Sequence, residues 1–264
     1  MADLQAILRQ EQRQRRRLVW QLMAVGAVIL AAAHFSGLFD GPRLAEGLPA
    51  LWQIFLESLP PDFSDWRSWF GPLLDTLAMS IAGTALAMVM AVPLGILAAV
   101  NTSPSLVVYK VVRLLLNLFR AVPELIMGIL FVAAVGFGVL PGVLALAFHS
   151  IGMVGKFVAE AIEHADAEII DAIRATGARP LQVIVHGVLP QVVPRIADVT
   201  LYRWEYNFRA STVMGMVGAG GIGFQLMSSL RLMNYAEVSA ILLLILATVS
   251  LVDGVGAWLR GRLK

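Results

Sequence analysis

The chain has 264 residues, of which 58% are hydrophobic and only 14% are charged. Soluble domains carry roughly 25% charged residues, so this chain has too few charges to cover a soluble surface of its size. The composition predicts an all-α integral membrane protein. Cysteine is absent, which excludes disulfides, a thiolate nucleophile and cysteine-ligated metal ions. The four histidines have neither HxxxH nor HExxH spacing, so a metal site is not expected.

Residues 1–70 are predicted to form a separate N-terminal part. Arginines crowd the segment before Leu18, and the run from Leu18 to Phe35 has no charge. That order also fits a cleaved signal peptide, but no clear small-x-small cleavage site follows. We expect a retained transmembrane helix with its N-terminus inside. An external acidic loop over 36–70 then contains a short surface helix near 44–58.

Residues 71–264 are predicted to form the membrane core. An uncharged run over 76–100 predicts the second span, which starts at Asp75 and is kinked at Pro93 and Gly95. The kink is tolerable in a membrane because neighbouring helices can satisfy the freed backbone groups.

The segment over 105–120 has apolar residues at helical spacing with basic residues between them, which predicts an interfacial helix. The next uncharged stretch, 125–155, is too long for one span and is broken near its middle by glycines and a proline. We therefore expect two spans joined by a tight external hairpin. The first starts near Pro123 and the second ends near Glu160.

Two last spans are expected over 192–216 and 238–258, with a glycine-rich bend between them. The full expectation is six transmembrane helices, both termini in the cytoplasm, and a polar cytoplasmic segment between helices four and five.

The span over 192–216 contains several ionisable residues, which are costly at membrane depth unless they face a partner or an aqueous cavity. Arg203 or Arg209 would offer a fork of donors to a passing oxyanion, held in place by Glu205 and Asn207. The alternative is an internal arginine–glutamate pair that only locks helix packing. Glu205 and Arg209 lie one helical turn apart and are expected to pair.

Residues 218–223 read GAGGIG and match the pattern G-x-G-x-x-G. A dinucleotide site needs a preceding β-strand, whereas the neighbours here are membrane helices. The glycines predict either a flexible bend that lines a pore or a close approach of helices. A GxxxxGK(S/T) motif is absent, so we expect no cofactor on this chain. The candidate pathway and gate residues are Arg203, Glu205, Asn207, Arg209, Ser211, Thr212, Gly218, Gly220, Gly221 and Gly223.

Two isolated polar residues have simpler expected roles. Glu124 is expected near the inner end of the third helix, as an interfacial residue or a partner for Arg120, with a transport role as the alternative. His149 lies on an apolar helix and is expected to be packed and hydrogen-bonded.

The segment over 160–190 is a polar interruption between two apolar regions. Isoleucines at helical spacing, with acids between them, predict an amphipathic helix that ends at Gly177. Pro180 fits the first turn of a second short helix. Nearby arginines place the segment inside the cell.

This segment resembles the signature loop of importer-type ABC permeases, which reads E-A-A, three residues, glycine, nine residues and I-x-L-P. The spacing is intact, and the matching positions are Asp171, Ala172, Ile173, Gly177, Leu189 and Pro190. Ile173 in place of alanine and Gly187 in place of isoleucine depart from the pattern. In such permeases the loop forms a coupling helix that docks on the ATPase subunit.

A narrower resemblance, to phosphonate-type permeases, rests on 205–223 and on 120–124. Together the two resemblances cover 70–264 and imply the permease subunit of an ABC importer for phosphonate or a phosphite-like oxyanion, with no catalytic residues. They imply that the chain lies in the inner membrane. The implied partners are a second permease copy, two ATPase subunits that hold ATP and Mg²⁺, and an extracytoplasmic binding protein. The lipid bilayer is the remaining partner, and no nucleic acid is expected.

Three alternatives remain open from the sequence. The same machine could import glycine betaine or methionine, whose permeases share the loop and a glycine-rich bend. An intramembrane enzyme would need a metal constellation or a nucleophile–base pair, which the motifs do not provide. A secondary transporter or channel would act without any ATPase.

Overall fold

The computed structural model describes residues 2–263, and its elements in that range are all helices. The chain divides into two compact units, Met1–Glu57 and Ser58–Lys264. The first unit contains α1 (Ala2–Phe35) and α2 (Gly41–Glu57). The uncharged run predicted to span the membrane lies within α1, and α2 confirms the surface helix predicted near 44–58.

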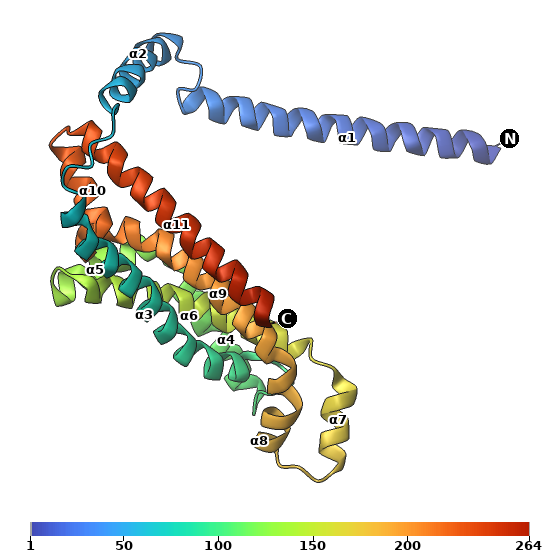
Figure 1. The fold of residues 1–264 in the computed structure, drawn as a ribbon. Helices are drawn as coiled ribbons and strands as arrows, with labels where there is room; N and C mark the ends of the chain where they lie inside the picture. Colours follow the sequence, from blue (N-terminus) through green and yellow to red (C-terminus); the bar gives the residue numbers. More distant parts are fainter. Residues whose placement is uncertain (1, 264) are drawn as a thin grey trace. The chain divides into compact units, whose positions relative to one another are not determined.

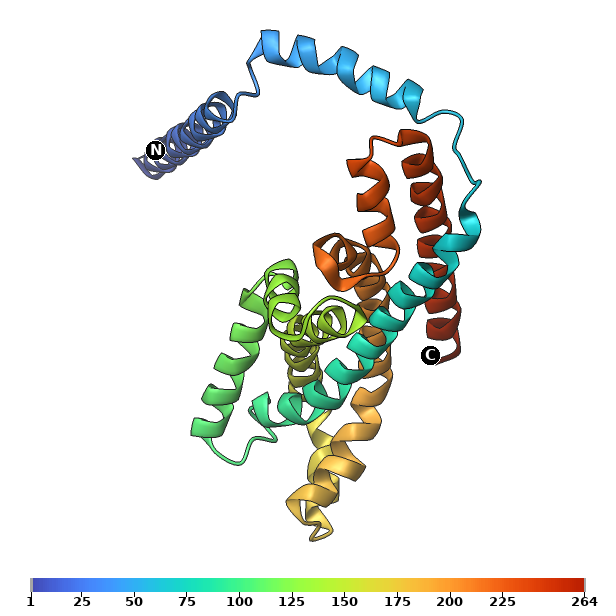
Figure 2. The same ribbon diagram turned by 90° about the vertical axis from the view of Figure 1, so that its left-hand side faces the viewer.

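The second unit contains the long helices that build the membrane core (Figure 1). They are α3 (Trp66–Ala98), α4 (Leu106–Ala121), α5 (Glu124–Val135), α6 (Val139–Glu163), α9 (Leu189–Met214), α10 (Ile222–Arg231) and α11 (Tyr235–Leu263). Helix α6 packs along α3, and α9 contacts α3, α6 and α11. Figure 2 shows α9 and α11 side by side, with the segment between α6 and α9 extending beyond one end of the unit.

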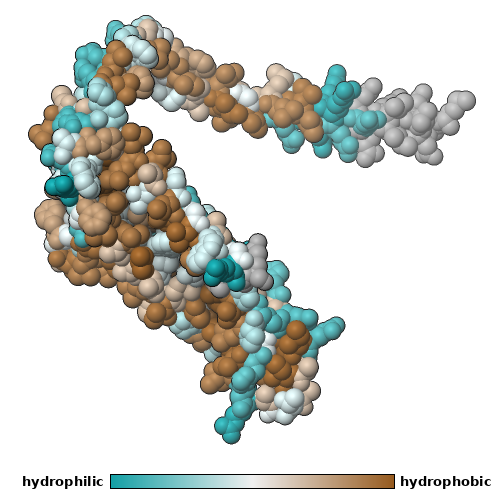
Figure 3. All heavy atoms as spheres, in the orientation of Figure 1, coloured by the Kyte–Doolittle hydropathy of each residue, from teal (hydrophilic) through white to brown (hydrophobic). Residues whose placement is uncertain are grey.

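Four helices of the described chain are long and apolar enough to cross a membrane, and up to six spans result if each of two bent helix pairs counts as one. The all-helical membrane architecture is therefore confirmed. Hydrophobic side chains cover the middle of the second unit, whereas hydrophilic side chains gather near its ends (Figure 3). Large apolar residues such as Val89 and Leu246 are more than half exposed, as expected for a surface in contact with lipid or another membrane subunit.

The predicted third span is wrong in form. Helix α5 has 12 residues, which cover only about 18 Å of a hydrocarbon core about 30 Å thick. It is bent by 85° from α4, so α4 and α5 together form one of the two bent pairs that count as a single span. The physical reason is Pro123, because a residue before proline avoids the α region, and Val122 is extended with φ −86° and ψ 123°.

Helix α3 corrects one further expectation, because Asp75 is an exposed residue inside the helix and not its first residue. The helix includes Pro93 and Gly95, where the kink stays a prediction. Gly95 allows close packing: a Cβ added there would lie 2.6 Å from Cβ of Val158 on α6. Small residues at such contacts let membrane helices approach closely.

Candidate functional site

The polar segment between α6 and α9 forms a helical hairpin. Its parts are α7 (Ala167–Ala175), α8 (Pro180–Val183) and the π-helical turn η1 (Ile184–Val188). Asp166 caps α7 by accepting a hydrogen bond from the Glu168 backbone N–H at 2.9 Å. Gly177 has φ +82°, a conformation that disfavours side chains. The predicted helix–glycine–helix order is therefore confirmed, and we call this segment the hairpin.

The two departures from the loop pattern lie against each other inside the hairpin. A Cβ added to Gly187 would lie 3.3 Å from Cδ1 of Ile173. The larger residue at 173 therefore occupies space that a larger residue at 187 would otherwise fill. This compensation was invisible in the sequence, where the two substitutions stood as independent mismatches.

The other loop positions lie along the surface of the hairpin and at its end. Asp171 pairs with Arg174 at 3.0 Å on the exposed side of α7, and Ala172 is exposed beside it. Leu189 and Pro190 begin α9. The loop residues therefore form one continuous structure, from an exposed helix to the base of a membrane helix.

A salt-bridge joint at the base of the hairpin was missed by the sequence reasoning. The guanidinium of Arg113 on α4 contacts both carboxylate oxygens of Glu163, the last residue of α6, at 2.7 and 2.8 Å. Arg113 Nε donates to the Ala98 carbonyl at 3.0 Å, and the Val100 N–H donates to Glu163 at 2.9 Å. The joint therefore ties α4 to the ends of α3 and α6, and the hairpin begins directly after α6.

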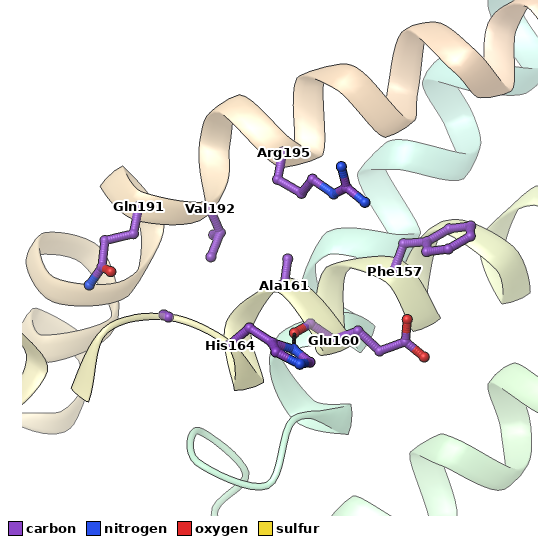
Figure 4. A pocket seen from close by; sticks show the side chains of 8 residues that line it. Phe157, Glu160, Ala161, His164, Gln191, Val192 and Arg195 are labelled. Carbon is purple, nitrogen blue, oxygen red and sulfur yellow. Dashed lines mark hydrogen bonds between the residues drawn. The ribbon is translucent and has the colours of Figure 1, made fainter. Parts of the chain in front are cut away.

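A cavity of about 460 Å³ lies beside this base, between the end of α6 and the start of α9. Figure 4 shows Glu160 and His164 on the α6 side, with Arg195 and Gln191 on the α9 side. Gln191 joins the two sides because it accepts a hydrogen bond from the Asp166 N–H, just beyond α6, at 2.8 Å. Its amide also donates to the Gly187 carbonyl, one turn before it, at 2.6 Å.

Helix α9 presents a buried polar row to α3 and α6. Asn207 is fully buried and donates to Thr84 at 2.9 Å and to Ser150 at 3.1 Å. Arg203 Nε donates to the same Ser150 hydroxyl at 2.8 Å. The Ser211 hydroxyl reaches the Thr76 carbonyl of α3 at 3.2 Å, besides the Phe208 carbonyl of its own helix at 2.7 Å. Because unsatisfied polar groups are costly in a membrane, these bonds fix the rotation of α9.

Helix α9 also forms two ion pairs with α11, and these overturn the predicted Glu205–Arg209 pair. Arg260 binds Glu205 at 2.6 Å, and Arg209 binds Asp253 at 2.9 Å. Glu205 is only 8% exposed, and Gly256 makes room for it: a Cβ there would lie 2.8 Å from the Glu205 Cδ. Both ion pairs therefore connect α9 to α11, whereas the predicted pair would have stayed within α9.

Glu124 lies in a second polar cluster and does not pair with Arg120, whose guanidinium binds Asn117 at 3.0 Å. Glu124 accepts a hydrogen bond of 2.6 Å from the Tyr206 hydroxyl, and its other oxygen lies 3.6 Å from His149 Nε2. His149 is hydrogen-bonded to the Val122 carbonyl at 3.2 Å, as predicted for a packed histidine. The proline that ends α4 thus brings Glu124 to α9.

A cavity of about 380 Å³ opens between α5 and α9 beside this cluster. It is lined by Pro123, Glu124, Leu125, Tyr206, Arg209, Ala210, Val213 and Met214. Of the candidate pathway residues, only Arg209 lines it directly. Arg203 stacks on the Tyr206 ring, with its guanidinium carbon 4.2 Å from the ring centroid.

The glycine-rich bend turns the chain and also brings helices close together, whereas its predicted place along a pore stays a prediction. Gly218 near the end of η2 (Gly215–Ala219), and Gly220 and Gly221 between η2 and α10, have positive φ angles, and the chain turns by 60° at this break. Gly223, in contrast, is a packing residue, because a Cβ there would overlap the carbonyl of Thr212. Thr212 itself donates back to the Arg209 carbonyl at 2.7 Å.

The chain matches the family of binding-protein-dependent transport system inner membrane components over residues 91–264, and it belongs to this family. It is 61% identical to the phosphite transport system permease protein PtxC of Stutzerimonas stutzeri over 248 residues, which cover 94% of this chain and 90% of that protein. It is 39% identical to the putative phosphite transport system permease protein HtxC of the same organism, over 93% of this chain and 87% of the relative.

The fold is similar to a chain of the MetNI methionine ABC transporter in an inward-facing conformation. The TM-score is 0.67 at 23% identity, and the match covers 76% of this chain and 99% of that chain. The family match over residues 91–264 confirms the membership predicted from the loop at 171–190. The protein is a membrane subunit of a transport system.

Proposed function

We propose that this chain is the permease subunit of an ABC importer for phosphite or a related phosphonate in the cytoplasmic membrane. The observation that carries the proposal is the 61% identity to a phosphite permease over 94% of the chain. A permease for glycine betaine or methionine is the alternative. The core over 71–264 moves the solute, and the segment over 1–70 adds a membrane anchor.

Energy comes from partners in this proposal. Two ATPase subunits bind ATP and Mg²⁺ and dock on the hairpin, which faces the cytoplasm together with both termini. Their closure pulls on the base of the hairpin, and the Arg113–Glu163 joint passes the motion to α3 and α4. A binding protein docks on the opposite side, because a switch needs contacts that differ between its two states. A second permease copy completes the pathway.

Reconstituted transport tests the proposal. The permease, its co-encoded ATPase and its binding protein are placed in proteoliposomes, and uptake of radiolabelled phosphite is followed with and without ATP. We expect ATP-dependent uptake that unlabelled methylphosphonate or phosphite suppresses and glycine betaine does not. Uptake of glycine betaine or methionine without phosphite would overturn the substrate class. Flux through the permease alone would overturn the importer class.

A further inference from the structure

A pocket with a basic rim opens between α4 and α6, close to the base of the hairpin, and we call it the basic pocket. Its volume is about 200 Å³, which is room for several groups of the size of water, since each water takes about 30 Å³. Its apolar lining residues are all buried: Ala98, Leu116 and Ala159. Its polar lining residues are three bases and one amide: Arg113, Arg120, Lys156 and Asn117.

Two of the three bases already have acidic partners. Arg113 holds both carboxylate oxygens of Glu163 in the salt-bridge joint. Lys156 lies 3.4 Å from Glu160, one turn further along α6, and the two side chains are 45% and 42% exposed. Exposed pairs of this kind are weak because water screens them, so the ammonium group of Lys156 can exchange Glu160 for another anion.

The third base, Arg120, has a neutral partner. Its Nε and Nη2 contact Oδ1 of Asn117 at 3.2 and 3.0 Å. Among the ion pairs of the part of the chain that the structure describes, none includes Arg120. Three bases therefore face two acids at the basic pocket, and the unbalanced charge lies on a half-buried guanidinium. The planar fork of a guanidinium matches two oxygens of a phosphate group.

The surface of α4 beside the basic pocket is apolar. Four residues recur there at helical spacing, each between 56% and 70% exposed: Val107, Val111, Leu114 and Leu118. At 3.6 residues per turn, Asn117 and Arg120 lie on the helix between this stripe and the buried side of α4. A phospholipid has the same order of parts, because its charged phosphate is followed by acyl chains. Basic pockets between membrane helices are typical sites for acidic lipid headgroups.

We propose that the basic pocket binds a phosphate group, either the headgroup of an acidic phospholipid or a free phosphorus oxyanion. The apolar stripe of α4 favours the lipid, whose acyl chains then lie along it. The bound phosphate bridges Arg120 on α4 and Lys156 on α6, beside the salt-bridge joint, and so holds these two helices together at the base of the hairpin. This site is additional to the proposed transport pathway and does not depend on which solute is transported.

Lipid titration tests this assignment. The purified complex of the permease and its partner subunits is stripped of lipid in detergent, and binding of radiolabelled phosphatidylglycerol and phosphatidylcholine is measured. We expect a preference for phosphatidylglycerol. Arg120→Gln should weaken its binding roughly fivefold, and adding Lys156→Gln should weaken it further. Arg195→Gln removes the same charge from an exposed position that lines the other cavity, so this matched control should bind phosphatidylglycerol like the wild type.

A second variant covers the case in which loss of Arg120 disturbs folding. Asn117→Asp keeps the size of an exposed side chain but gives Arg120 a carboxylate partner inside the basic pocket. It should lower phosphatidylglycerol binding while the complex stays monodisperse. Titrating the same variants with inorganic phosphite, without acidic lipid, separates the two sources of the phosphate group. Loss of phosphite binding with unchanged phosphatidylglycerol binding would identify the free oxyanion as the ligand.

Either of two results would overturn the assignment. Monodisperse Asn117→Asp and Arg120→Gln complexes that bind both phosphatidylglycerol and phosphite like the wild type would show that the basic pocket holds no phosphate group. An equal loss of binding in Arg195→Gln would show a general effect of surface charge and no specific site.

Discussion

The hairpin and the polar face of α9 both break the apolar pattern of the chain, but the structure treats them differently. In the hairpin, the charged pair Asp171–Arg174 has side chains that are 68% and 54% exposed. On α9, Glu205 is 8% exposed and Asn207 is fully buried. The hairpin extends beyond the helices of the core, whereas α9 lies among three of them (Figures 1 and 2).

The difference shows how a membrane protein manages polar residues. Water can hydrogen-bond to the exposed polar groups of the hairpin. Because exposed ion pairs contribute only about 0–1 kcal/mol to stability, the charges of the hairpin can change at little cost to the fold. Buried groups on α9 must be satisfied by other helices, and each bond fixes a helix position. Substitutions inside the core should therefore affect stability, and substitutions in the hairpin should mainly affect coupling.

The largest effect is expected for Gly223→Ala at the glycine-rich bend. The new Cβ would overlap the backbone carbonyl of Thr212, and a backbone group cannot move aside as a side chain can. We expect a loss of about 3 kcal/mol or more, seen as a much lower temperature at which the detergent-solubilised protein loses its monodisperse form. Gly71→Ala on α3 meets nothing within 4 Å and serves as the control. Equal melting of both variants would contradict tight packing at the bend.

A smaller loss is expected for Gly256→Ala on α11. Its Cβ would displace the Glu205 carboxylate from Arg260, and weakening a buried ion pair should destabilise the protein by about 2 kcal/mol. Gly254→Ala, two residues away with nothing within 4 Å, should melt like the wild type or slightly higher. If the two variants behave alike, the Glu205–Arg260 pair does not hold α9 to α11.

The fold was predictable where the signal is local. Runs of apolar residues gave the long spans, and Gly177 and Pro180 gave the two parts of the hairpin, because backbone preferences act on single residues. The same reasoning failed at α5, where length suggested a span. There Pro123 bent the chain by 85° relative to α4, and composition alone carries no information about the angle between two helices.

The polar contacts were predictable as a class but not as pairs. Ionisable residues on α9 had to find partners, yet Glu205 and Arg209 bind Arg260 and Asp253 on α11. An i, i+4 pair is worth only about 0.5 kcal/mol, so stronger partners on a neighbouring helix win. The joint of Arg113 and Glu163 joins residues 50 positions apart, and no local pattern indicates it.

The smallest effect on the fold is expected for exchanging the two unusual residues of the hairpin. Gly187→Ile should crowd Ile173 and cost about 1 kcal/mol locally, and Ile173→Ala should lose a comparable amount of packing. The double variant restores the small residue at 173 and the large residue at 187 that the loop pattern usually has. Its ATPase stimulation should therefore return towards the wild-type level. A double-mutant cycle on ATPase stimulation by the binding protein, in the full complex, measures the coupling. We expect each single variant to lower stimulation severalfold with a nearly unchanged melting temperature. If the double variant is as impaired as the sum of the singles, the two positions are independent, and the hairpin does not transmit force through this contact.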